Sequence, residues 1–221
     1  MKLKKVASLC SKANIFCLYD REESDDRVSQ WLGDMGAIYP ITGLPYMDEE
    51  NIYSMFDIPA KKQEKITFRH QRAPEEINLS DTDPTERRIS EENLSVVYDG
   101  GVLKPLQTRN GIKFIQRGYL APLEDVADMV QLYERRTPQG ATYIVAKTGL
   151  FLAAVIMPYN VINERFVHQL STLARECSCA LEKKRFITPA AEEADEAQCG
   201  INVDESTGEI IEFPGETEAE Q

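Results

Sequence analysis

The stretch YIVAKTGLFLAAVIMPYNVI, residues 143–162, is the most apolar run of the chain and decides the fold class. A transmembrane helix needs about 20 consecutive apolar residues, and this run is interrupted by Lys147, Thr148, Gly149, Pro158 and Asn160. Its centre, LFLAAVIMP, is short, rich in branched and aromatic side chains and closed by proline, which is typical of a buried strand. The run therefore predicts a core strand rather than a membrane anchor or a ligand pocket.

The segments before this run alternate polar and apolar residues, as the strands of a half-buried sheet do. Residues 141–148 (ATYIVAKT) alternate and end in Thr148-Gly149, which predicts a hairpin turn into the apolar strand. Residues 129–137 (MVQLYERRT) alternate as well and are followed by the turn sequence Pro-Gln-Gly. We therefore expect three successive antiparallel strands, a meander, in residues 129–158.

Residues 2–13 predict a short amphipathic helix, because apolar residues recur there at helical spacing while Lys2, Lys5 and Lys12 lie toward the other side. Asp48 is expected to cap a second short helix over residues 49–57.

The order strand, strand, short helix, strand then occurs twice. The first copy comprises residues 15–20, 36–41, 49–57 and 65–70, and the second comprises residues 94–100, 111–116, 119–128 and 130–135. The spacing between the copies drifts, so a loose structural pseudo-repeat is one interpretation and chance alternation in an α+β chain is the other.

The C-terminal part predicts an amphipathic helix over residues 164–186, opened by Asn163. Its apolar line is expected to pack on the sheet or on another copy of itself, and it consists of Phe166, Leu170, Leu173, Cys177 and Leu181.

Residues 189–221 contain 11 acidic residues and no basic ones, whereas the other 188 contain 26 acidic and 25 basic residues. Eleven of the twelve net negative charges therefore lie in the tail, which we expect to be disordered and either simply solvated or used to bind a partner or mimic DNA.

These elements predict an α+β fold with a mainly antiparallel sheet, short helices in the loose pseudo-repeat, a C-terminal amphipathic helix and an acidic tail. The expected organisation is an N-terminal α+β half (1–70), a polar linker or long loop (71–93), a C-terminal α+β half with the terminal helix (94–188), and the tail (189–221). Whether residues 71–93 separate two domains or bridge one sheet stays open.

No sequence motif carries catalytic chemistry. His70 and His168 are expected at the surface, the cysteines at 10, 17, 177, 179 and 199 form no CxxC pair, and no glycine-rich phosphate loop precedes a helix. The acidic loop LSDTDPTE (79–86) lacks the glycine and terminal glutamate of a calcium loop. We therefore expect a non-enzymatic protein without cofactor or metal and, because no apolar signal segment is present, a cytoplasmic one without a membrane partner.

Residues 111–161 (GIKFIQRGYLAPLEDVADMVQLYERRTPQGATYIVAKTGLFLAAVIMPYNV) resemble the second half of a sliding-clamp domain, the fold of ring-shaped DNA polymerase processivity factors. The resemblance rests on Tyr119-Leu120 and Leu123 in the helix and on the sequence Val-Ile-Met-Pro that ends the meander. The N-terminal helix that feeds a strand is similar to the start of phage clamps. In its charged turns and acidic tail, the chain also resembles proteins of Firmicutes prophages and mobile elements.

The resemblance implies a phage or mobile-element accessory protein of DNA replication, in which helices line a hole and Lys2, Lys5 and Lys12 meet DNA phosphates without reading sequence. The implied partners are a DNA polymerase or another replication protein, non-specific DNA, and further copies of the chain. The acidic residues of the other two short helices depart from this pattern. The alternative is a protein-interaction module, such as a phage inhibitor of host defence, that acts through its acidic tail or a sheet edge.

Overall fold

The computed structural model describes residues 2–23, 27–90 and 94–187, which fall into two compact units. The first unit comprises residues 1–161, and all described strands belong to it. The second unit comprises residues 162–221, and its described part is the helix α4 (Glu164–Ile187). None of the described helices is both long enough and apolar enough to cross a membrane.

The first helix, α1 (Leu3–Ala13), buries Val6, Ala7 and Cys10, which lie on one side of the helix. The helix ends at Asn14, which adopts the left-handed conformation with φ of 53° and donates its N–H to the carbonyl of Cys10. Asparagine tolerates this conformation better than most residues and often ends helices. The helix predicted over residues 2–13 is therefore confirmed.

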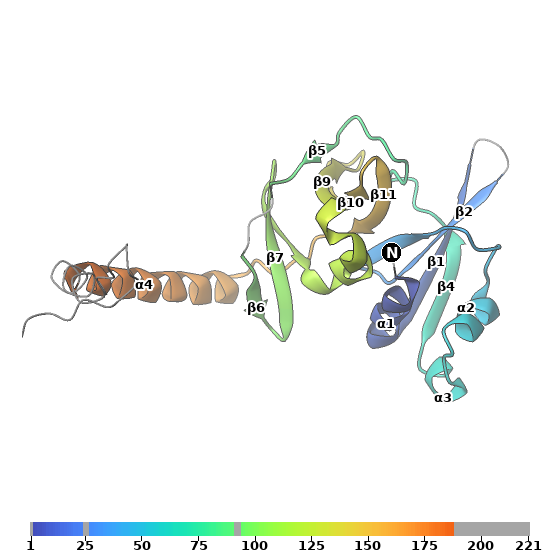
Figure 1. The fold of residues 1–221 in the computed structure, drawn as a ribbon, viewed down its shortest axis with the longest axis horizontal. Coiled ribbons are helices and arrows are strands. Elements are labelled where there is room, and N and C mark those ends of the chain that lie inside the picture. The colour runs from blue at the N-terminus through green and yellow to red at the C-terminus, as the bar shows by residue number, and fades with distance from the viewer. Residues whose placement is uncertain (1, 24–26, 91–93, 188–221) are drawn as a thin grey trace, which may run out of the picture. The chain divides into compact units, whose positions relative to one another are not determined.

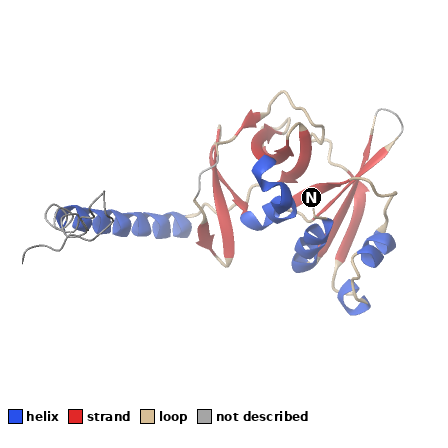
Figure 2. Ribbon diagram, in the orientation of Figure 1, coloured by secondary structure: helices blue, strands red, loops and turns tan. Residues whose placement is uncertain are grey.

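A large sheet of eight strands forms the centre of the first unit, in the order β4-β1-β2-β3-β11-β10-β9-β5 (Figures 1 and 2). Neighbouring strands are antiparallel, except that β1 and β4 are parallel. The predicted α+β class is confirmed, and the sheet is mixed rather than purely antiparallel. The strands are β1 (Ile15–Glu22), β2 (Val28–Gly33), β3 (Ala37–Ile41), β4 (Thr67–Arg72), β5 (Arg87–Arg88), β9 (Val130–Arg136), β10 (Thr142–Thr148) and β11 (Phe151–Ile156).

Six of these strands form two matching halves. Helix α1 leads into the meander β1-β2-β3, and the 3₁₀ helix η1 (Arg117–Met129) leads into the meander β9-β10-β11. The halves meet where β3 and β11 pair antiparallel, with Ile38 opposite Val155 and Ala37 opposite Ile156. The strand order is therefore symmetrical about this central pair.

This spatial repeat differs from the order noted in the sequence. The strands expected in the second sequence copy at residues 94–100 and 111–116 are β6 (Val96–Tyr98) and β8 (Gly111–Gln116), which lie in a separate sheet with β7 (Gly101–Thr108) between them. Their counterparts in the first copy, β1 and β3, lie in the large sheet. The order of elements recurs along the chain, but the pairing of the strands does not.

Each face of the large sheet is covered by a different layer. One face packs against α1, η1 and the short helix α2 (Glu49–Met55), and its buried residues include Phe16, Leu18, Leu32, Tyr39, Leu132, Ile144 and Ile156. The other face packs against the segment that contains Leu79, and its buried residues include Trp31, Tyr143, Val145, Leu152 and Val155. The helix α3 (Ala60–Gln63) follows α2 and buries none of its residues.

The predicted cap of α2 is confirmed, because the Asp48 carboxylate accepts the backbone N–H of Asn51 at 2.8 Å. Within residues 71–93, where a linker or long loop was predicted, Leu79 and Ile89 are buried and β5 pairs with β9. The predicted helix over residues 164–186 corresponds to α4. The predicted acidic tail lies outside the described residues.

Candidate functional site

The three lysines predicted to meet DNA lie on or beside α1. Lys5 and Lys12 are seven residues apart, which brings them within about 20° of the same direction around the helix axis. Lys12 and Lys2 are exposed, and Lys5 is half-exposed. Lys2 precedes the helix, and its backbone N–H donates to the carbonyl of Pro122 in η1 at 2.8 Å. Lys2 and Lys5 therefore lie where α1 borders η1, and Lys12 extends from the last turn of α1 in about the same direction as Lys5.

The charge of Lys5 is countered by a residue of η1. Its Nζ forms an ion pair with the Glu124 carboxylate, and both side chains are partly exposed. Two more acidic residues of η1, Asp125 and Asp128, are exposed. The helix pair therefore presents a basic α1 beside an acidic η1, and Lys5 is the point at which the two charges meet.

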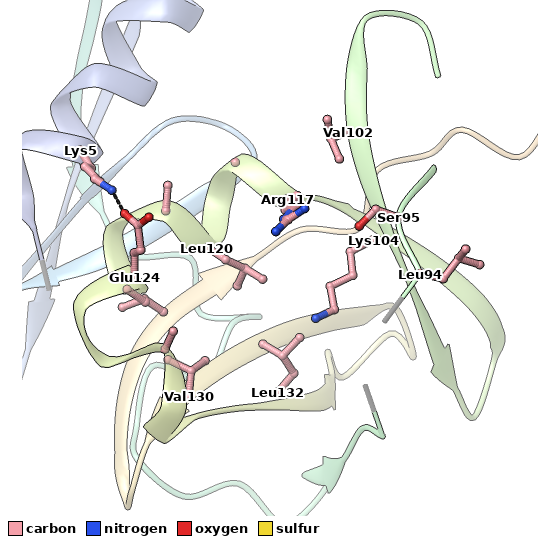
Figure 3. Close-up of a pocket in the computed structure, with 14 residues that line it drawn as sticks. Lys5, Leu94, Ser95, Val102, Lys104, Arg117, Leu120, Glu124, Val130 and Leu132 are labelled. Atoms are coloured by element: carbon pink, nitrogen blue, oxygen red, sulfur yellow. Dashed lines mark hydrogen bonds and ion pairs between the residues drawn. The ribbon is translucent and has the colours of Figure 1, made fainter. Parts of the chain in front are cut away.

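A cleft of about 640 Å³ lies between η1, β7 and β9 (Figure 3). Leu120, Val130 and Leu132 give it an apolar lining, and the Lys104 side chain extends from β7 toward Val130 and Leu132. Arg117, at the start of η1, adds a second cationic side chain. Apolar walls with a few charged groups are typical of ligand pockets, so the chemistry of this cleft suits an anion with an apolar body.

A second cluster of polar side chains joins β1, β2 and β4. The Asp20 carboxylate accepts Gln30 Nε2 at 2.8 Å and the Tyr46 hydroxyl at 2.7 Å, and it lies 2.9 Å from Nε2 of His70. Burial acts to raise the pKa of Asp20, but the hydrogen bonds from Gln30, Tyr46 and His70 together hold it below its ordinary value. Burial is the largest single influence on this pKa, and the three hydrogen bonds outweigh it only in combination.

His70 is exposed, as the sequence predicts, but the sequence did not predict this cluster. Asp20 and His70 are 50 residues apart and become neighbours because β1 and β4 pair in parallel, with Asp20 opposite Arg72. To find this cluster from the sequence, one would have had to predict that IFCLYD (15–20) and KITFRH (65–70) pair in one sheet. Within the described residues, His70 contacts Asp20 and Tyr46, and neither is the nucleophile that a catalytic triad requires.

The carboxylates of the acidic loop of residues 79–86 bind other groups of the first unit. Asp83 accepts the Thr85 hydroxyl at 2.5 Å and an Asn78 N–H at 2.8 Å, and Asp81 accepts the backbone N–H of Leu152 at 2.7 Å. Glu86 binds Lys147 at 2.9 Å. Over the part of the chain that the structure describes, no group of three or more acidic, histidine or cysteine side chains is arranged to hold a metal ion.

Comparison with family models, with curated proteins and with solved structures found no match. The residues and geometry of this chain therefore carry the functional argument.

Proposed function

We propose that this protein is a non-enzymatic accessory of DNA replication that contacts duplex DNA in the manner of a sliding clamp. The supporting observation is the pair of helix-plus-meander halves, in which α1 and η1 lie against each other on one face of a continuous sheet. The segment that resembles a clamp half folds as a strand, a helix and a meander, namely β8, η1, β9, β10 and β11. Helices on one sheet face are the arrangement that the resemblance implies for the side that meets DNA.

The charges on α1 support a contact with the phosphate backbone. The helix and its cap contain four lysines and no acidic residue. Lysines that neutralise phosphates bind DNA without reading its sequence, and the affinity falls as salt rises. In this proposal Lys2 and Lys12 contact phosphates directly, whereas Glu124 competes with DNA for Lys5.

The test is the binding of the full-length chain to a fluorescent duplex, measured at several salt concentrations. The double variant Lys2→Gln/Lys12→Gln should bind more weakly, and its plot of log affinity against log salt should flatten by about 2 because two phosphate contacts are lost. The matched control is Lys61→Gln/Lys62→Gln on α3, which removes the same charge from exposed residues elsewhere in the first unit. Equal behaviour of the two double variants would refute a contact through α1.

A second variant tests the competition for Lys5. Glu124→Gln removes the carboxylate that pairs with Lys5 and leaves a side chain of the same shape. DNA affinity should rise, with a steeper salt dependence than that of the unchanged chain. A fall in affinity, or no change, would mean that Lys5 does not contact DNA.

Two observations favour the alternative of a protein-interaction module. Leu150 is 80% exposed and Phe151 is 69% exposed at the turn between β10 and β11, and apolar side chains gathered at a surface often mark interaction sites. β4 also forms one end of the large sheet, so its outer edge is the place where a partner strand would pair. Absence of DNA binding at low salt would favour this alternative.

A further inference from the structure

The apolar residues of α4 are spaced for contact with a second helix from Phe166 to Ala180. The helix is capped by Asn163, whose Oδ1 accepts the backbone N–H of Phe166 at 2.9 Å. Apolar residues then follow at alternating intervals of four and three, which is the heptad spacing of helices that pack side by side. We call this line the α4 seam, and it consists of Phe166, Leu170, Leu173, Cys177 and Ala180.

Most of the seam lies open within the described part of the second unit. Phe166 is buried and Leu170 is half-buried, but Leu173 is 56% exposed and Cys177 and Ala180 are exposed. Beside the seam, Val167 and Leu181 are 52% and 55% exposed. A row of exposed leucines and valine along one side of a helix is unusual, because burial of such side chains is what normally stabilises a helix.

The physical need for a partner follows from the sequence of α4. In proteins, most of the stability of a helix comes from the packing of its apolar side rather than from the intrinsic helix propensity of its residues. The side of α4 opposite the seam is polar and includes His168, Arg175 and Glu182. The helix therefore has one polar side suited to water and one apolar side, the α4 seam, whose burial would stabilise it.

We propose that the α4 seam is a self-association surface, covered by α4 of a second copy of this chain. We choose a second copy as the partner because of the heptad spacing. A seam with intervals of four and three fits another seam with the same intervals, and two copies supply identical seams. This proposal does not rest on DNA binding, which concerns residues of the first unit.

Two cysteines provide a test within the helix itself. Cys177 lies in the seam, whereas Cys179 is two residues further on and points about 200° away around the axis. Both thiols are free and exposed in a single chain. A partner helix on the seam should therefore protect Cys177 from alkylation and leave Cys179 reactive.

The experiment measures the alkylation rate of each cysteine in the full-length chain by peptide mass spectrometry, over a range of protein concentrations. When roughly 90% of the chains are associated, Cys177 should react about tenfold more slowly, because only the dissociated chains expose it. The two rates should converge on dilution, and light scattering should show the mass falling to that of one chain over the same range.

Leu173→Glu places a charge in the seam and should abolish both the protection of Cys177 and the association. His168→Glu adds the same charge on the opposite, exposed side of α4 and should change neither. A chain that is monomeric at all concentrations overturns the proposal. Protection that does not depend on concentration overturns it as well, because the seam would then be covered within one chain. Association that survives Leu173→Glu means that the copies meet elsewhere, which also refutes the seam.

Discussion

At the scale of single residues, Arg135 shows how a charged side chain can belong to the core. It lies on β9 with no exposure to solvent, and its Nε donates to Oε2 of Glu86 at 2.8 Å. Its terminal nitrogens donate to the backbone carbonyls of Asn78 at 2.9 Å, Ser80 at 2.8 Å and Asp81 at 3.2 Å. One guanidinium therefore satisfies three carbonyls of the segment that covers the sheet and holds that segment in place.

We expect Arg135→Met to destabilise the first unit strongly. Methionine keeps much of the apolar stem, but Glu86 is left with Lys147 as its cationic partner and the backbone carbonyls of Asn78, Ser80 and Asp81 each lose a donor. Removal of one partner from a buried ion pair costs about 3–5 kcal/mol of unfolding free energy. Urea unfolding measures this cost.

The matched control is Arg87→Met on β5, where the arginine is exposed. It should change the unfolding free energy by less than about 0.5 kcal/mol. Equal losses in the two variants would show that Arg135 contributes no more than a surface arginine.

At the scale of elements, the turn between β2 and β3 is fixed by a carboxylate and two glycines. Asp34 is buried, and its Oδ1 accepts the backbone N–H groups of Gly36 at 2.7 Å and Ala37 at 2.9 Å. Its Oδ2 accepts the Tyr119 hydroxyl at 3.2 Å, which links the turn to η1. This turn therefore ties the first meander to the helix of the second half.

Gly33→Ala should disrupt this turn, because an added Cβ would overlap the carbonyl oxygen of Ala37 and the backbone would have to move. Forcing extra atoms into a packed site costs about 1–3 kcal/mol. Gly118→Ala is the control, since its Cβ would meet Leu9 at 3.8 Å, an ordinary contact. Thermal unfolding should show a lower midpoint for Gly33→Ala alone, and an unchanged midpoint would mean that the turn relaxes freely.

The elements that could be predicted from the sequence are those whose signal is local. The meander of β9, β10 and β11 follows from alternation and turn residues, α1 follows from helical spacing, and the Asp48 cap follows from one side chain and the amide it binds. Each signal lies within a few residues. Sequence reasoning was therefore sufficient for the types of most elements.

What could not be predicted depends on contacts between distant parts of the chain. The antiparallel pair β3 and β11 joins residues more than a hundred positions apart, and nothing local indicates that these two meanders share a sheet. For the same reason, Lys5 was expected to be available for DNA, whereas Glu124, 119 residues away, forms an ion pair with it. Polarity alone also gave no sign that residues 71–93 contain buried Leu79 and Ile89.

At the scale of the whole molecule, the first unit contains several partly or fully buried thiol and phenol groups with raised pKa values. Burial raises the pKa of the Cys10 thiol and of the Tyr39 and Tyr119 hydroxyls, with further contributions from the charge of Asp34. Burial likewise raises the pKa of Tyr53 to about 12, helped by a hydrogen bond to Glu49. These groups are neutral in the folded chain at pH values where their unfolded counterparts would already ionise.

The sign of the pH dependence follows from these raised pKa values. Below about pH 9 both states hold their protons, and the stability that these groups contribute is fully present. Above it the unfolded chain releases protons from thiols and phenols while the folded chain retains them, so stability falls as pH rises. Cys10, Tyr39 and Tyr119 all contribute to this loss in the same direction, because burial raises the pKa of each of them.

We therefore expect the first unit to unfold cooperatively between about pH 10 and pH 12, and circular dichroism and phenolate absorbance should change together. Tyr39→Phe removes one of the buried phenols and should make the loss of stability with pH less steep, although the hydrogen bond from Tyr39 to the carbonyl of Tyr119 is lost. Tyr159→Phe, at an exposed position, is the control and should leave the steepness unchanged. If phenolate absorbance rose fully while the circular dichroism stayed native, the buried tyrosines would be accessible to solvent, and their hydroxyls could not be part of a closed core between the helices and the sheet.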